Sequence, residues 1–283
     1  MAALSSPFSA LRAASFTFEE LQSGIYVGGQ GDPLLLIHGS GPGASSIGNW
    51  RLVLDRLASR YSVIAMDLIG FGSSDRRAEP PYFDFELWVR QAKAALDLFG
   101  RDKIGVIGHS ISGAIALRIA AEDTRVNRVM TTGTMGARMP VTPALSKIWR
   151  CPASREEMRS AAQALIADDE LITDAYLDAR MEIIGSEEYR LYFDTMFEGD
   201  FEHYINAAVV SDDILARVSV PVMMLHGRED LAFPAETGSL ALLDKMPDAD
   251  CMLLGRCSHS IAMERTETFL SAIHNHFARQ DER

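Results

Sequence analysis

The sequence is poor in positive charge, in cysteine and in long apolar runs. Its 283 residues include 27 lysines and arginines against 39 aspartates and glutamates, which gives a formal net charge of -12. Proteins that bind nucleic acid need clustered lysine and arginine to meet the phosphates, so we expect no nucleic-acid partner. No apolar run approaches the roughly 18 residues that a membrane helix needs, so we expect no membrane partner either.

Cysteine is limited to Cys151, Cys251 and Cys257. An odd and sparse set of cysteines is not a disulfide framework, so a reducing compartment is expected. We interpret Cys257 as a buried structural thiol rather than a nucleophile. Residues 1–18 contain one cation, Arg12, and lack the cationic start and continuous apolar core of a signal peptide. We therefore expect a cytoplasmic protein, and we predict neither a metal site nor a cofactor.

Apolar segments of strand length alternate with helix-like segments along most of the chain. Strands are predicted at residues 15–21, 24–27, 33–37, 62–66, 126–130, 220–225 and 251–254, and in the short run that ends at Gly108. Helices are predicted at residues 50–57, 84–99, 235–245 and 264–278. This alternation is typical of an α/β fold with a mostly parallel, doubly wound sheet, in which the loops after the strands meet at one edge.

Strand signals disappear between residues 136 and 211. This region instead contains charge-dotted, helix-like segments at residues 156–167, 174–184 and 187–196. A helical insertion after the sixth strand of an α/β sheet is expected to cover the edge where ligands bind. We therefore predict a core built from residues 1–135 and 212–283, and a helical cap built from residues 136–211.

Residues 108–113 read Gly-His-Ser-Ile-Ser-Gly and join a predicted strand to a helix of small residues. This arrangement is typical of a nucleophile elbow, in which a sharp turn exposes a serine and the flanking positions carry little side chain. Gly108 meets that demand two residues before Ser110, whereas Ser112 stands where a second glycine is usual. An ordinary strand-to-helix turn has the same pattern, so the other members of a catalytic triad must decide between the two.

A carboxylate and a histidine follow the last two predicted strands. Asp230 comes after the strand at residues 220–225, and His259 comes after the strand at residues 251–254. Serine, acid and histidine in this chain order define the triad of an α/β hydrolase, because the acid orients the base that activates the serine. We predict Ser110, Asp230 and His259 as catalytic residues, and we favour Asp230 over its neighbour Glu229.

The remaining histidines have less catalytic support. His38 and His226 also end strands, but neither follows the last strand, so both are interpreted as structural. His109 adjoins the nucleophile, and two hypotheses stay open: it packs beneath the elbow, or it lines the substrate pocket. Surface or packing roles are expected for His203, His274 and His276.

Acyl chemistry also needs donors for the oxyanion that develops in the transition state. The amide of Ile111, directly after the nucleophile, is one predicted donor. The other is expected from the glycine-rich loop at residues 38–43, and Ser40 is the favoured residue.

Several segments together resemble the α/β-hydrolase superfamily over nearly the whole chain, and more narrowly the meta-cleavage product hydrolases. The resemblance rests on residues 38–44, 49–51, 70–72, 226–230 and 255–257. It implies that Gly41 and Asn49 contact substrate and that Arg180, in the cap, binds the substrate carboxylate. The family usually has asparagine at the position of His109 and tryptophan at that of Ser260. Both positions line the substrate in the family, so His109 and Ser260 are predicted to contact it here.

The resemblance implies hydrolysis of a carbon–carbon bond in a 2-hydroxy-6-oxo-2,4-dienoate, an acidic diketone, to 2-hydroxypenta-2,4-dienoate and a carboxylic acid. A carboxylesterase or lactonase with the same triad is the first alternative, and Ser260 motivates it. A ligand-binding protein that keeps the hydrolase fold is the second. A homodimer is expected only because dimers are the habit of the family. The 6-substituent of the substrate depends on the apolar lining of the cap.

Overall fold

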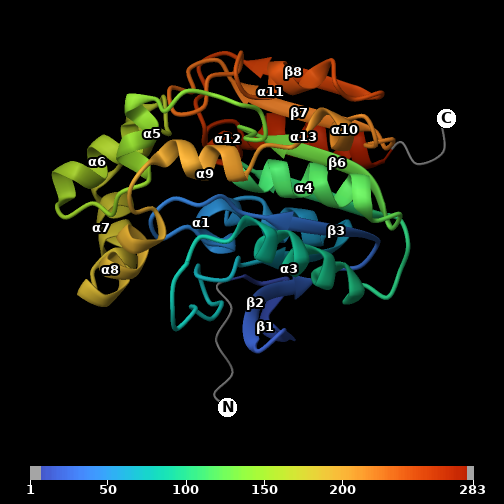
Figure 1. The fold of residues 1–283 in the computed structure, drawn as a ribbon. Helices are drawn as coiled ribbons and strands as arrows, with labels where there is room; N and C mark the ends of the chain where they lie inside the picture. The colour runs from blue at the N-terminus through green and yellow to red at the C-terminus, as the bar shows by residue number, and fades with distance from the viewer. Residues whose placement is uncertain (1–7, 279–283) are drawn as a thin grey trace.

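The structure is a computed structural model that describes residues 8–278 (Figure 1). Residues 1–7, which carry part of the signal-peptide prediction, lie outside the described residues. The strands are β1 Leu11–Phe18, β2 Leu21–Gly28, β3 Asp32–Ile37, β4 Tyr61–Met66, β5 Ile104–His109, β6 Val126–Thr132, β7 Val222–Gly227 and β8 Ala249–Leu254. They form one sheet in the order β1-β2-β4-β3-β5-β6-β7-β8. The pairs β1–β2 and β2–β4 are antiparallel, and every later pair is parallel.

Helices cover both faces of this sheet. In the core they are α1 Ser46–Trp50, α2 Leu54–Ala58, α3 Phe85–Asp97, α4 Ile111–Glu122, α11 Ser239–Leu243, α12 Ile261–Glu264 and α13 Thr266–Phe277. Between β6 and β7 lie α5 Pro143–Ile148, α6 Arg155–Gln163, the 3-10 turn η1 Asp169–Leu171, α7 Asp174–Ile184, α8 Glu187–Met196, α9 Phe201–Ala207 and α10 Asp212–Leu215. Of the helices in residues 8–278, none has the length and apolar character required to cross a membrane.

The apolar run of β3 is consistent with a sheet that helices cover on both faces. Leu34 and Leu36 belong to the cluster that includes α2 and α13, whereas Leu35 and Ile37 belong to the cluster that includes α3 and α4. All four side chains are fully buried. Because neighbouring residues of a strand point to opposite faces, a strand covered on both sides needs a continuous apolar run. The prediction of a doubly wound, mostly parallel sheet is confirmed.

Two local predictions differ from the structure. The opening hairpin turns at residues 19–20 rather than after residue 21, because Glu19 adopts a left-handed φ of 52° between Phe18 and Leu21, which pair directly. The single helix predicted at residues 50–57 is instead α1 and α2, separated by a turn in which Val53 N–H donates to Trp50 O at 2.9 Å. This turn leaves Trp50 stacked on Phe269 of α13, with ring centroids 5.9 Å apart.

Helices α5 to α9 lie towards one end of the sheet, whereas α10 lies apart from them and packs against α4 (Figure 1). Aromatic contacts join them to the core: the centroid of Phe83 lies 4.8 Å from that of Tyr204 and 5.6 Å from that of Phe197. Phe71 and Phe193 make a similar edge-to-face contact at 6.4 Å. The helical insertion after the sixth strand is therefore present, while the division into 1–135 with 212–283 and 136–211 stays a prediction.

His276 on α13 gives the fold a predictable response to acid. Burial and the nearby positive charge of Arg128 lower the pKa of His276 from its ordinary 6.5 to about 4. Its Nε2–H donates to Val129 O at 2.9 Å, which favours the protonated ring, but burial outweighs this bond and the folded protein holds the imidazole neutral near pH 7. The unfolded chain takes up a proton below pH 6.5, so the free energy of unfolding falls as the pH drops from 7 towards 4, by roughly 3 kcal/mol from this group.

Urea unfolding of wild type and His276→Gln at pH 7 and pH 4.5 measures this contribution. Glutamine keeps an N–H donor for Val129 O but does not titrate. We expect the variant to lose clearly less stability between the two pH values than wild type. Equal losses would show that His276 does not set the acid response.

Candidate active site

Ser110 stands on a strained turn between β5 and α4. Its backbone has φ 59° and ψ -124°, a conformation that ordinary residues adopt only under constraint. The turn is tight: a Cβ added at Gly108 would lie 2.0 Å from the carbonyl oxygen of Ser112. Ser112 is tolerated where a second glycine is usual because its side chain is buried and donates a hydrogen bond to His38 O at 2.5 Å. The elbow therefore has the geometry of a nucleophile turn.

Asp230 and His259 form a buried pair at the ends of β7 and β8. His259 Nδ1 lies 2.7 Å from Asp230 Oδ2, and Asp230 Oδ1 accepts from the amides of Ala232 and Phe233 at 3.1 and 2.9 Å. Burial alone raises the pKa of Asp230, but the charge and hydrogen bonds of His259 and His226 outweigh it and bring the pKa below its usual range. The carboxylate is therefore ionised and orients the imidazole with Nδ1–H towards it, which leaves Nε2 to accept a proton.

Two glycines let the backbone pass close to these groups. A Cβ at Gly39 would lie 3.0 Å from Ser110 Cβ, and a Cβ at Gly133, where φ is 53°, would lie 2.6 Å from His259 Nδ1. Within residues 8–278, no hydrogen bond joins Ser110 Oγ to His259. Such contacts often tighten only when substrate is bound.

Glu229 and His226, the alternatives to Asp230 and His259 in the triad, form hydrogen bonds with other groups. Glu229 Oε2 accepts from Cys257 N–H at 3.0 Å and does not contact His259. His226 bonds to Ser239 Oγ and Phe233 O, both at 2.7 Å, although its Nε2 also lies 3.5 Å from Asp230. These contacts support the interpretation of His226 as structural, which stays a prediction.

His38 and Cys257 also have structural surroundings. His38 Nδ1–H donates to Gly39 O at 2.6 Å, and its Nε2 accepts from Leu68 N–H at 3.0 Å. Both ring nitrogens are therefore occupied. Burial raises the pKa of the Cys257 thiol to about 12, so the thiolate that a nucleophile requires is not formed near neutral pH.

His109 satisfies both hypotheses left open by the sequence. Its Nδ1 contacts Thr132 O at 3.2 Å and Thr132 Oγ1 at 2.9 Å, and its ring centroid lies 4.6 Å from that of His259. Burial and the adjacent His259 hold the pKa of His109 well below its usual value. The carbonyl of Thr132 can only accept, so Nδ1 carries the hydrogen and Nε2 is a neutral acceptor. The same ring lines the cavity described next.

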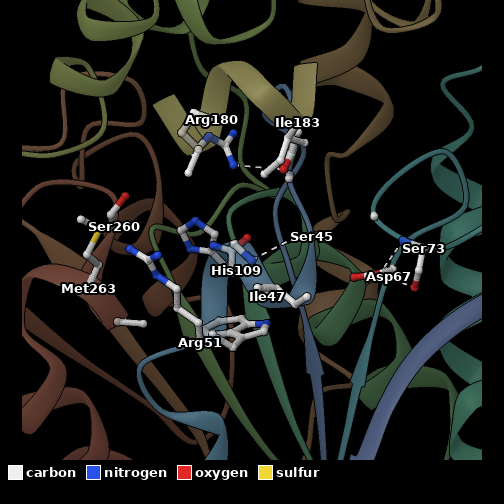
Figure 2. Close-up of a pocket in the computed structure, with 18 of the residues that line it drawn as sticks. Ser45, Ile47, Arg51, Asp67, Ser73, His109, Arg180, Ile183, Ser260 and Met263 are labelled. Atoms are coloured by element: carbon white, nitrogen blue, oxygen red, sulfur yellow. Dashed lines mark hydrogen bonds between the residues drawn. The ribbon is translucent and has the colours of Figure 1, made fainter. Parts of the chain in front are cut away.

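A cavity of about 510 Å³ is lined by His109 and Ser260, the chain neighbours of Ser110 and His259, but not by the three triad residues themselves (Figure 2). Of the predicted substrate-binding residues, Asn49, His109, Arg180 and Ser260 line it. Gly41 does not line it, although a Cβ at Gly41 would meet no atom within 4 Å, so its backbone faces open space. The mixture of apolar side chains with a few convergent polar groups is typical of a small-molecule site.

The predicted oxyanion donors come from the elbow itself and from the glycine-rich loop. Ile111 begins α4, and the first amides of a helix have no partner within the helix, so this N–H is available to a ligand. Ser40 is buried, and its Oγ accepts from the indole N–H of Trp149 at 3.2 Å. Trp149, which follows α5 of the cap, thus covers the glycine-rich loop next to Ser40. Neither Ser40 nor Ile111 lines the cavity of Figure 2.

Besides the bond from Trp149, the cap holds residues 42–43 of the glycine-rich loop through three hydrogen bonds. Arg180 on α7 donates to Gly43 O at 3.0 Å and to Pro42 O, and the amide of Gly43 donates to Tyr189 Oη on α8 at 2.5 Å. The contact of Tyr189 with this loop was not predictable from the sequence, because no local pattern links α8 to a loop 146 residues earlier. Thr132 was missed because the predicted strand ended at residue 130, two residues before β6 does.

Tyr189→Phe tests the contact between the cap and this loop. Phenylalanine leaves the buried amide of Gly43 without an acceptor, which costs about 1–3 kcal/mol of stability. We expect a fall of that size in the free energy of unfolding in urea and a lower kcat. Tyr82→Phe is the matched control, since the Tyr82 hydroxyl makes no hydrogen bond within residues 8–278. Equal effects of the two changes would contradict the role given to Tyr189.

A comparison with protein families supports the fold. The model of the alpha/beta hydrolase family matches residues 34–272, which is most of the chain. The protein belongs to the alpha/beta hydrolase family.

Within that family its similarity is to the meta-cleavage product hydrolases. The chain is 31% identical to 2-hydroxymuconate semialdehyde hydrolase of Pseudomonas sp. (strain CF600), over 92% of each chain. It is 29% identical to 2-hydroxy-6-oxo-2,4-heptadienoate hydrolase of Pseudomonas putida, over 92% of this chain and 94% of the relative. A crystal structure of the meta-cleavage product hydrolase CumD from Pseudomonas fluorescens superposes with a TM-score of 0.89 at 30% identity, covering 95% of this chain and 98% of that one.

Proposed function

We propose that this protein is a serine-dependent hydrolase that cleaves a carbon–carbon bond in a 2-hydroxy-6-oxo-2,4-dienoate and releases 2-hydroxypenta-2,4-dienoate and a carboxylic acid. The observation that carries the proposal is the buried Asp230–His259 pair, 2.7 Å apart, beside a cavity that arginine side chains line. Relatives with named dienoate substrates, similar over more than nine-tenths of the chain, support it.

In the proposed reaction Arg180 pairs with the substrate carboxylate, and His259 assists conversion of the enol to the ketone. His259 then takes the proton of Ser110, whose oxygen adds to the ketone carbon C6. The amides of Ile111 and Ser40 stabilise the resulting oxyanion. As the carbonyl re-forms, the bond between C5 and C6 breaks. Its electron pair passes into the dienolate, which is protonated and leaves.

Water completes the proposed cycle. His259 takes a proton from the water, whose oxygen adds to the acyl group on Ser110. The ester bond to Ser110 breaks, the carboxylic acid leaves, and the serine regains its proton. The sum is substrate plus one water to two products. The conjugated diketone is essential, because an unconjugated carbanion is a poor leaving group.

Loss of the yellow colour of the dienoate tests the proposal. Purified protein is mixed with dienoates that carry hydrogen, methyl or phenyl at C6, and with p-nitrophenyl esters for comparison. We expect kcat/KM to be higher for at least one dienoate than for any ester. A higher value for an ester would favour a carboxylesterase instead. The chemical nature of the 6-substituent, the homodimer and the cytoplasmic location stay predictions.

A further inference from the structure

Three arginines line the cavity, and two of them are held by the protein. Arg180 donates to the carbonyl of Gly43, as described above. Arg76 pairs with Glu188 at 3.7 Å, and its guanidinium lies 5.0 Å from the ring centroid of Tyr189. The third, Arg51, is exposed at the cavity and makes no side-chain hydrogen bond or ion pair within residues 8–278.

Arg51 also differs from the others in position. It directly follows α1 on the core side of the cavity, whereas Arg180 belongs to α7 of the cap. In Figure 2 the two side chains enter the cavity from opposite sides, with His109 between them. Ser260 and Met263 line the same part of the cavity as Arg51. The small side chain of Ser260 leaves room there for a ligand group.

The described lining of the cavity carries a net positive charge, with three arginines against one carboxylate. Asp67 is the one carboxylate among the described lining residues. It accepts from Ser46 N–H at 2.6 Å and from the N–H and Oγ–H of Ser73 at 2.8 and 2.9 Å. These donors are uncharged, so the Asp67 carboxylate keeps its negative charge and offsets one of the three arginines. In a chain of net charge -12, this positive cavity is a local exception that favours acidic ligands.

We propose that Arg51 binds a second carboxylate and that the preferred substrate is therefore a dianion. This inference rests on the proposed function, in which Arg180 holds the carboxylate common to all 2-hydroxydienoates. A guanidinium presents paired N–H donors that match a carboxylate, so an unpartnered arginine in a binding cavity selects such a group. His109 cannot take this role, because its neutral Nε2 is an acceptor and repels an anion.

The test compares two dienoates that share the common carboxylate, one with methyl and one with carboxyethyl at C6. Arg51→Met keeps the length of the side chain and removes its charge. We expect this change to lower the ratio of kcat/KM for the diacid to that for the monoacid by about 2- to 5-fold, the effect of one lost ion pair with an exposed guanidinium. Arg56→Met is the matched control, because Arg56 pairs with Glu267 outside the cavity, and it should keep the wild-type ratio.

Equal losses on both substrates would show that Arg51 shares the common carboxylate with Arg180. An unchanged ratio without loss would make it an ordinary solvated side chain. Either result overturns the proposal.

Calorimetric binding of heptanedioate and heptanoate separates this proposal from the proposed function, because it needs no turnover. We expect wild type to prefer heptanedioate and Arg51→Met to lose that preference. If wild type turns over no dienoate, the proposed function fails while this binding result still decides the role of Arg51. Absence of a wild-type preference for heptanedioate overturns the proposal.

Discussion

Ser110→Ala lowers kcat for the dienoate by at least about 10⁴-fold, which is the loss expected when a triad loses its nucleophile. The change removes one oxygen from a buried position, so the fold and the cavity are retained. The measurement is the rate at which the dienoate absorbance disappears, together with the equilibrium binding of the same dienoate. We expect binding within a few fold of wild type while turnover is lost.

Ser160→Ala serves as the control for Ser110→Ala, since Ser160 lies on α6 and its hydroxyl contacts Lys147 rather than the elbow. This variant should turn over substrate at the wild-type rate. Residual turnover above about one per cent in Ser110→Ala would show that water attacks without the serine, and the route through an acyl-enzyme would have to be abandoned.

Asp230→Asn lowers kcat by about 10⁴-fold through the orientation of a single hydrogen. The asparagine oxygen still accepts from the amides of Ala232 and Phe233, so the NH₂ group turns towards His259 Nδ1. The imidazole must then accept at Nδ1 and carry its hydrogen on Nε2. In that tautomer it cannot take the proton of Ser110.

The matched control for Asp230 is its neighbour. Glu229→Gln neutralises an adjacent carboxylate that bonds to Cys257 N–H and not to His259, so we expect activity close to that of wild type. Dienoate turnover measured from pH 6 to pH 9 compares the three proteins. If Glu229→Gln, rather than Asp230→Asn, lost activity, the acid of the triad would be misassigned.

Residues that follow strands were predictable from the sequence, whereas contacts across the cap were not. Parallel strands deliver their following loops to one edge, so strand order alone brings Asp230 and His259 together once the apolar runs are located. The contact between Tyr189 and Gly43 depends on how a helical insertion settles on a distant loop, and hydrophobic periodicity holds no information about that. The sequence marked Arg51 only as part of the motif at residues 49–51. Its role in the cavity could not be predicted, because the absence of a partner depends on the three-dimensional surroundings of the side chain.

Local turns limited the prediction in a similar way. The helix expected at residues 235–245 shortens to α11 because the backbone of Gly238, with φ -104° and ψ -113°, is not helical. A Cβ at Gly238 would also lie 3.0 Å from Cε1 of His226, so this backbone packs against a structural histidine. The sequence has helical periodicity throughout residues 235–245, but tertiary contacts determine the backbone path at the start of this segment. The predicted helix was therefore too long.

The three bonds from Arg180 and Tyr189 to the loop at residues 42–43 have a consequence for chimeric hydrolases. The loop before α1 is fixed partly by side chains that belong to the inserted segment. A cap transplanted from another hydrolase to change the accepted substrate would therefore have to bring its own phenol and guanidinium in register with this loop. In a chimeric hydrolase, the cap and the loop at residues 42–43 should therefore be exchanged together.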